Sequence, residues 1–170
     1  MIKKFIVPIT VAVIAILFIV LHIAKVPTVF NTGYLYRECG INENKCELVS
    51  KTDSHGGFHG DGTYSAVYDC TACKDYILKI VQKWNRFPLS ENLELILYGG
   101  EKDGLTYGYE LAKGIGFPKI SDGYWFFLDR HSERKNSNSD EELFDRYSFN
   151  FSVAIYDADS NMLYYIREDT

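Results

Sequence analysis

The N-terminal part of the chain contains an uninterrupted apolar segment. Residues 5–24 read FIVPITVAVIAILFIVLHIA and carry no formal charge at neutral pH. A helix of twenty residues rises about 30 Å, which matches the hydrocarbon thickness of a bilayer. The pattern therefore predicts a transmembrane helix at 5–24, with residues 1–26 forming a membrane anchor.

The lysines around this segment predict its orientation. Lys3 and Lys4 precede the apolar segment, whereas Lys25 alone follows it closely, so the positive-inside bias places the N-terminus in the cytoplasm and residues 27–170 outside. A cleaved signal peptide would have a shorter apolar region and a small-x-small cleavage site, and a core helix apolar on every face is unusual in so small a domain. We therefore expect an uncleaved anchor in the cell membrane, followed by one extracytoplasmic domain.

Within residues 27–170 the apolar pattern changes between the periods of helices and strands. Residues 73–85 place apolar side chains at helical spacing and predict one principal amphipathic helix. Residues 140–146 predict a short second helix. Strands are expected at 63–69, at 92–98, at 124–129 as a central strand covered on both faces, and at 148–156 and 162–167, which flank a turn at 157–161. Hairpin-length connections favour an α+β domain with a mainly antiparallel sheet.

Composition and charge restrict the function of this domain. Hydrophobic residues make up 46% of the whole chain, and this share excludes a disordered protein. Beyond residue 26 there are 15 basic and 23 acidic residues, a net charge of −8, and no extended basic cluster. Nucleic-acid binding normally requires such a cluster, so we expect no nucleic-acid partner.

A glycine-rich segment at 53–62, DSHGGFHGDG, is the first candidate site. Its candidate ligands are Asp53, His55, His59 and Asp61, because imidazole and carboxylate groups suit a divalent metal, with His55 and His59 as the principal metal ligands. The alternative is a glycine-rich connection whose polar side chains bond to their own backbone.

Four cysteines, Cys39, Cys46, Cys70 and Cys73, form the second candidate site. Their even number favours disulfides in an extracytoplasmic domain, with Cys39 and Cys46 the simplest pair. The CTACK segment at 70–74 resembles the CxxC-Lys motif of thioredoxin-like proteins over about a dozen residues, although Asp69 stands where that family has Trp. Structural disulfides, a four-thiolate zinc site and a redox pair remain alternatives, and the redox alternative predicts an exposed Cys70 sulfur at a helix N-terminus.

Several longer segments, HGGFHGDG, GYWFFLDR, RYSFNFSVAIYD and LYY, resemble a group of uncharacterised membrane-anchored proteins of Gram-positive bacteria. The resemblance covers most of residues 53–170. It implies a shared fold and an outer-surface location, and no substrate or catalytic residue.

No catalytic signature in the chain decides whether it is an enzyme. The leading hypothesis is a membrane-tethered extracytoplasmic module that binds a protein or a small molecule. The alternatives are a metal-assisted hydrolase at the His55 and His59 segment and a thiol oxidoreductase at Cys70 and Cys73.

Overall fold

The computed structural model describes residues 33–56 and 60–170. This part of the chain is an α+β domain with a mainly antiparallel sheet, as predicted. The predicted transmembrane segment at 5–24 lies outside the described residues. Within the described ranges, no helix is long and apolar enough to cross a membrane.

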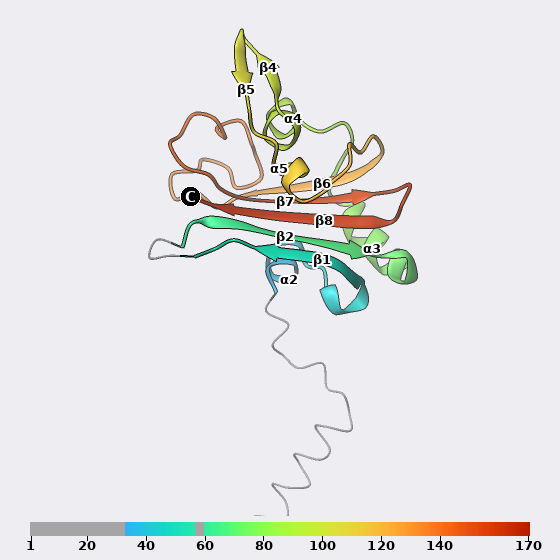
Figure 1. Ribbon diagram of the computed structural model, residues 1–170. Coiled ribbons are helices and arrows are strands. Elements are labelled where there is room, and N and C mark those ends of the chain that lie inside the picture. The colour runs from blue at the N-terminus through green and yellow to red at the C-terminus, as the bar shows by residue number, and fades with distance from the viewer. Residues whose placement is uncertain (1–32, 57–59) are drawn as a thin grey trace, which may run out of the picture. The chain divides into compact units, whose positions relative to one another are not determined.

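The main sheet runs through the middle of the domain (Figure 1). Its strands pair antiparallel throughout, in the order β1 (Glu47–Asp53), β2 (Gly62–Asp69), β8 (Met162–Asp169), β7 (Asn150–Asp157), β6 (Gly123–Asp129) and β3 (Asn85–Arg86). The hairpin of β7 and β8 lies at the centre and confirms the predicted C-terminal hairpin. β1 lies at one edge of the sheet, and all its residues are exposed.

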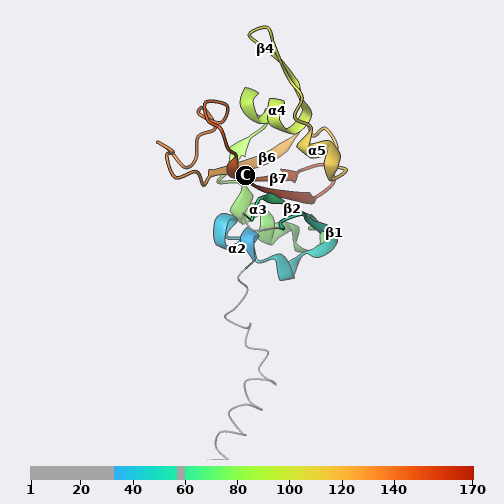
Figure 2. The ribbon, with the colours of Figure 1, turned by 60° about the vertical axis from the view of Figure 1, so that its left-hand side comes forward.

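Helices cover both faces of this sheet (Figure 2). α4 (Glu91–Tyr98) and α5 (Leu111–Gly114) pack on one face, and α2 (Tyr34–Cys39) and α3 (Lys74–Val81) pack on the other. Two short 3₁₀ helices, η1 (Glu43–Lys45) and η2 (Thr71–Cys73), precede β1 and α3. A small hairpin of β4 (Gly100–Lys102) and β5 (Leu105–Tyr107) projects away from the sheet.

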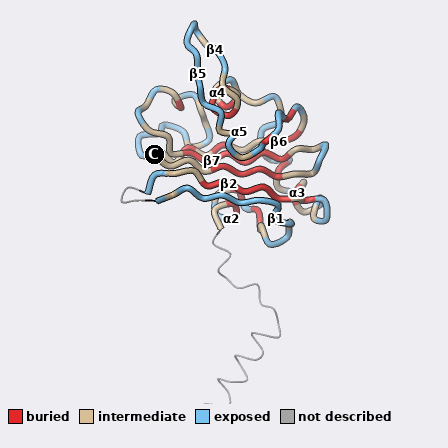
Figure 3. Tube along the Cα trace, viewed as in Figure 1, coloured by how far each residue is buried: buried red, intermediate tan, exposed pale blue. Residues whose placement is uncertain are grey.

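The domain therefore has two hydrophobic cores, one on each side of the sheet. Alternate residues of β7 serve the two cores, because successive side chains of a strand point to opposite faces. Phe151, Val153 and Ile155 pack towards α4, whereas Ala154 and Tyr156 pack towards α2 and α3. The central strands consequently pack against a core on each face, and Figure 3 shows that most of their residues are buried.

Three predictions about the elements need correction. Residues 92–98 form a helix rather than a strand, because Ser90 caps its N-terminus by accepting a hydrogen bond from the Leu93 amide, and Glu91 and Glu94 lie in the first turn. Residues 140–146 form successive turns rather than a helix. The strand predicted at 124–129 lies next to the edge, since only the two-residue strand β3 pairs with its outer side.

The predicted helix at 73–85 is present but shorter. It ends at Val81, and its apolar residues Ile77 and Val81 are fully buried. It is one of four α-helices in the described part of the chain, so the expectation of one principal helix underestimated the helical content.

Candidate functional site

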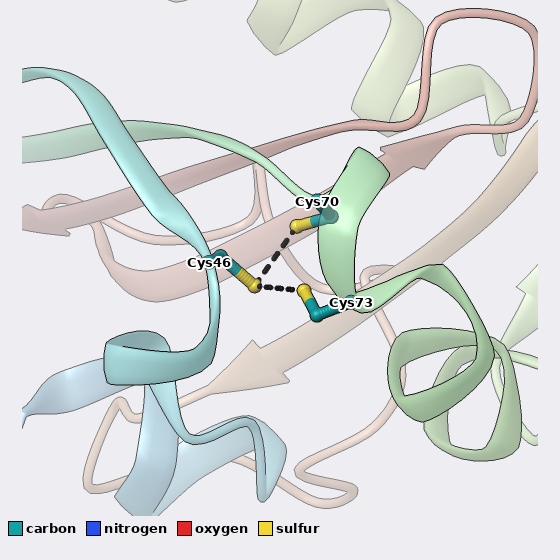
Figure 4. A group of neighbouring side chains, drawn as sticks. All are labelled: Cys46, Cys70 and Cys73. Atoms are coloured by element: carbon teal, nitrogen blue, oxygen red, sulfur yellow. Dashed lines mark hydrogen bonds between the residues drawn. The ribbon is translucent and has the colours of Figure 1, made fainter.

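The pairing of β1 with β2 brings distant cysteines together. Glu47 lies opposite Asp69 in this pair, so Cys46, just before β1, meets Cys70, just after β2. The 3₁₀ helix η2 then turns the chain, with the Cys73 amide donating to the Cys70 carbonyl, and places Cys73 beside the same point. Figure 4 shows the three side chains converging from these two segments.

The sulfur atom of Cys46 is in direct contact with the sulfur atoms of Cys70 and Cys73. Cys46 Sγ lies 2.9 Å from Cys73 Sγ and 3.1 Å from Cys70 Sγ, and all three sulfurs lie within 4.8 Å of one another. These separations exceed the roughly 2.05 Å of a disulfide bond, and the three residues are free thiols. Cys70 is fully buried, whereas Cys46 and Cys73 are partly accessible.

The hydrogen bonds within the cluster distinguish the thiols. The Cys70 thiol donates to Cys46, and this bond, together with the weaker effect of the contact with Cys73, lowers the pKa of Cys46 to about 7 against the opposing effect of burial. The pKa of Cys70 is raised, first by its bond to Cys46 and then by burial. Burial raises the pKa of Cys73 to about 11. Cys46 is therefore the thiol that ionises first.

Two hollows in the surface adjoin the cluster from different sides. Cys46 borders one of about 320 Å³, and Cys73 borders another of about 700 Å³, so each can be reached by a molecule from solvent. The larger hollow is also lined by Lys45, Lys74 and Asp75. Cys70 lines neither hollow.

The structure corrects several predictions about the cysteines. Cys39 packs in the core beneath α2 and is 7% exposed, and its sulfur does not belong to the cluster of Cys46, Cys70 and Cys73. Cys39 and Cys46 are therefore not paired in this structure, where all four cysteines are free thiols, and Cys39 does not complete a four-thiolate site. The expectation of an exposed Cys70 sulfur is also wrong, since the buried end of β2 holds it.

The described part of the glycine-rich segment places His55 between two carboxylates. His55 Nδ1 lies 2.7 Å from Asp53 Oδ1, and His55 Nε2 lies 3.2 Å from Asp169 Oδ2. Hydrogen bonding to Asp53, and secondarily to Asp169, raises the pKa of His55. Both ring nitrogens thus face carboxylates. Asp61 is exposed, and it lines a surface hollow together with His55. His59 lies outside the described residues.

Asp169 belongs to a charged network that sequence reasoning did not reveal. Its carboxylate accepts hydrogen bonds from Arg130 and Arg167, and Arg167 also pairs with Glu38 of α2. Tyr165 donates to Glu38 at 2.6 Å. Arg130 and Arg167 thereby neutralise the carboxylates of Asp169 and Glu38. These ion pairs hold α2 and the end of β6 against β8. The spacing of Arg167 and Asp169 on one face of a strand was the one signal in the sequence.

In the described part of the chain, the cysteine cluster is the one group of side chains that converges closely enough to hold a metal ion. Comparisons with protein-family models, curated protein sequences and solved structures gave no significant match. The resemblances seen in the sequence therefore stay predictions, and the function is argued from the geometry of the site.

Proposed function

We propose that the protein is a thiol–disulfide oxidoreductase tethered at the outer face of the cell membrane. One observation carries the proposal: Cys46 Sγ lies within 3.1 Å of two other cysteine sulfurs. Disulfide exchange requires an ionised sulfur next to a second thiol that can displace the substrate from it. The proposal keeps the CxxC pair found in the sequence and adds Cys46 as the attacking group.

The exchange needs no group beyond the thiols and a disulfide substrate. The Cys46 thiolate attacks one sulfur of the substrate disulfide, forms a mixed disulfide and releases the other substrate sulfur as a thiolate, which takes a proton from water. Cys73 then attacks Cys46 Sγ, passing its proton to the second departing substrate sulfur. Two protein thiols become one disulfide, and one substrate disulfide becomes two thiols.

The three cysteines suit different steps of this exchange. Cys46 ionises most readily and borders a hollow open to solvent, so it suits the attack. Cys73 is partly accessible and lies 2.9 Å from Cys46, so it suits the release. Cys70 is buried and leaves a free thiol beside a disulfide between Cys46 and Cys73. That third thiol lets the disulfide move within the cluster by exchange.

The proposed location rests on the sequence. The apolar segment at 5–24 and the lysines around it support a membrane anchor with the domain outside. Disulfides persist in an extracytoplasmic compartment, where disulfide substrates are present. A tethered oxidoreductase would act on proteins at the membrane surface.

The test uses the full chain in detergent micelles, equilibrated in glutathione buffers from reducing to oxidising. We expect a disulfide joining Cys46 to Cys73 or Cys70, identified by peptide mass spectrometry, and reduction of a disulfide-bonded test peptide by the reduced protein. Cys46→Ser should abolish peptide reduction and Cys73→Ser should slow it, because Cys70 can still displace the substrate, whereas Cys39→Ser should retain the full rate. Absence of peptide reduction in the unmodified protein, or equal loss in Cys39→Ser, would overturn the proposal.

A groove supports a second candidate function, the binding module expected from the sequence. It has a volume of about 740 Å³ and lies between α4 and the segments at 87–89 and 119–121. Its apolar side chains are Phe87, Pro88, Leu89, Leu95 and Ile120. Glu91, Glu94, Glu101 and Lys119 also line the groove, so a concave surface of this size suits a small ligand with an apolar body and a polar group. A fluorescent apolar dye should bind the full chain in detergent micelles. Ser121→Trp should weaken this binding, because Ser121 is an exposed residue at the groove.

A further inference from the structure

The three sulfurs of the cysteine cluster surround one point in space. They come from two chain segments 24 to 27 residues apart, and each sulfur lies within 4.8 Å of the other two. An ion bound at about 2.3 Å from each sulfur in tetrahedral geometry requires the sulfurs to be roughly 3.8 Å apart. The closer pairs, at 2.9 and 3.1 Å, need to separate by less than about 1 Å to reach this arrangement.

The backbone allows this small adjustment. Cys70 is fixed, because it is fully buried and its amide donates to the Asn161 carbonyl at 3.0 Å. Cys46 and Cys73 are partly exposed and border open hollows, so their side chains have room to rotate outwards. One fixed and two adjustable ligands can close around an ion without moving the sheet.

The charges near the cluster also suit a cation held by thiolates. Three thiolates and a divalent ion leave a local charge of −1. Lys45 and Lys74 line the hollow beside Cys73 and offset that charge in part, although Asp75 lies in the same hollow. The Asp69 carboxylate already accepts a hydrogen bond from the Thr71 amide at 2.8 Å and lies outside the sulfur cluster.

We propose that the reduced cluster binds one thiophilic divalent cation of the zinc class through Cys46, Cys70 and Cys73, with the fourth position open to solvent. Sulfur ligands select such ions over magnesium and calcium. Binding converts three thiols and the ion into a metal–thiolate complex and releases the thiol protons to solvent. The site uses the same sulfurs as the proposed exchange reaction and does not depend on it.

Metal binding and disulfide formation exclude one another in this cluster. A disulfide removes two of the three sulfur ligands, and a bound ion occupies the electron pairs that would attack a disulfide. Oxidation should therefore release the ion, and the ion should protect the thiols from oxidation. Because each thiol that ligates the ion must lose its proton, binding should strengthen as the pH rises.

The test measures zinc binding to the reduced full chain in detergent micelles, by competition with a chromophoric chelator and by elemental analysis. We expect one ion per chain, and a tetrahedral visible spectrum when cobalt replaces zinc. Cys46→Ser and Cys73→Ser should each weaken binding by about 100-fold or more, whereas the matched control Cys39→Ser should bind like the unmodified chain. Circular dichroism establishes that the variants are folded.

The outcomes separate this inference from the proposed function. Less than stoichiometric zinc in the reduced chain, or equal weakening in Cys39→Ser, overturns the metal site. Zinc binding without any reduction of a disulfide-bonded peptide supports the metal site and overturns the oxidoreductase. Peptide reduction by a chain that binds no zinc supports the oxidoreductase and overturns the metal site.

Discussion

The guanidinium of Arg146 forms a bidentate ion pair with the carboxylate of Asp129, with Nη1 2.8 Å from Oδ1 and Nη2 2.6 Å from Oδ2. Asp129 ends β6 and is 2% exposed, and the His131 amide donates to the same carboxylate at 2.9 Å. Burial alone would raise the pKa of Asp129, but the bonds from Arg146 and His131 outweigh it and hold the pKa below its usual range. The pair fixes the long connection between β6 and β7 to the sheet.

Removal of the arginine should therefore destabilise the domain strongly. Arg146→Ala leaves a buried carboxylate without its cation and should lower the free energy of unfolding by roughly 3 to 5 kcal/mol. The fluorescence of Trp84 and Trp125 during urea unfolding measures the change. The control is Arg134→Ala, at an exposed arginine of the same connection, with an expected effect below about 0.5 kcal/mol. A loss below about 1 kcal/mol for Arg146→Ala would contradict the structural role.

The ion pair of Arg146 and Asp129 predicts how the free energy of unfolding changes with pH in acid. A carboxyl group with a lowered folded-state pKa contributes stability above its unfolded pKa, near 3.9, and loses it as the pH falls through the folded value. Without Arg146, burial should raise the pKa of Asp129, so the difference between the unmodified chain and Arg146→Ala should be largest at neutral pH and shrink as the pH falls to about 4 and below. Urea titrations at several pH values test this, and a difference unchanged at acidic pH would contradict it.

The elements that the sequence predicted correctly are those with a clear apolar period. The strand at 63–69 and the C-terminal hairpin alternate or run apolar between turn residues, and both are present. Residues 92–98 alternate in the same way, yet Ser90 and the two acidic residues that follow it favour a helix. For this segment the capping residues indicate the helix, whereas the apolar pattern wrongly predicts a strand.

The candidate site was predictable only in part, for a related reason. The CxxC spacing identified Cys70 and Cys73, but Cys46 joins them through the register of Glu47 with Asp69. β1 lies exposed at the sheet edge and has no apolar stripe, so the sequence did not indicate this strand or its register. Closeness in sequence favoured Cys39 as the partner of Cys46, whereas α2 turns Cys39 into the core.

A glycine at the start of β6 is predicted to be irreplaceable. Gly123 has φ of +142°, and a Cβ atom added to it would lie 2.0 Å from the Tyr156 carbonyl oxygen of β7. Gly123→Ala must therefore push apart two paired strands and should lower the free energy of unfolding by about 2 kcal/mol or more. Gly108→Ala is the control, because its Cβ would meet no atom within 4 Å. Equal urea midpoints for the two variants would contradict this account.

The contacts of His55 predict a pH effect of the opposite sign. Its pKa is raised by Asp53 and Asp169, so its stabilising contribution is complete below the unfolded pKa, near 6.5, and is lost as the pH rises through the folded value. His55→Ala should lower the free energy of unfolding by about 1 kcal/mol in mild acid, and by less in mild alkali. A difference that grows with pH in urea unfolding experiments would exclude a protonated His55 between the two carboxylates.

The order in which the cysteines react tests the assignment of Cys46. Because its pKa is lowered to about 7, its alkylation by iodoacetamide should rise with pH and reach half its maximal rate near pH 7. Cys39 should stay unmodified in the folded chain, since burial raises its pKa and denies access to the reagent. Cys73→Ala removes one of the two thiols that contact Cys46 and should move the half-maximal rate to higher pH. Peptide mass spectrometry after short exposures measures each site separately. If Cys73 reacts before Cys46 in the unmodified chain, the attacking and resolving roles are reversed.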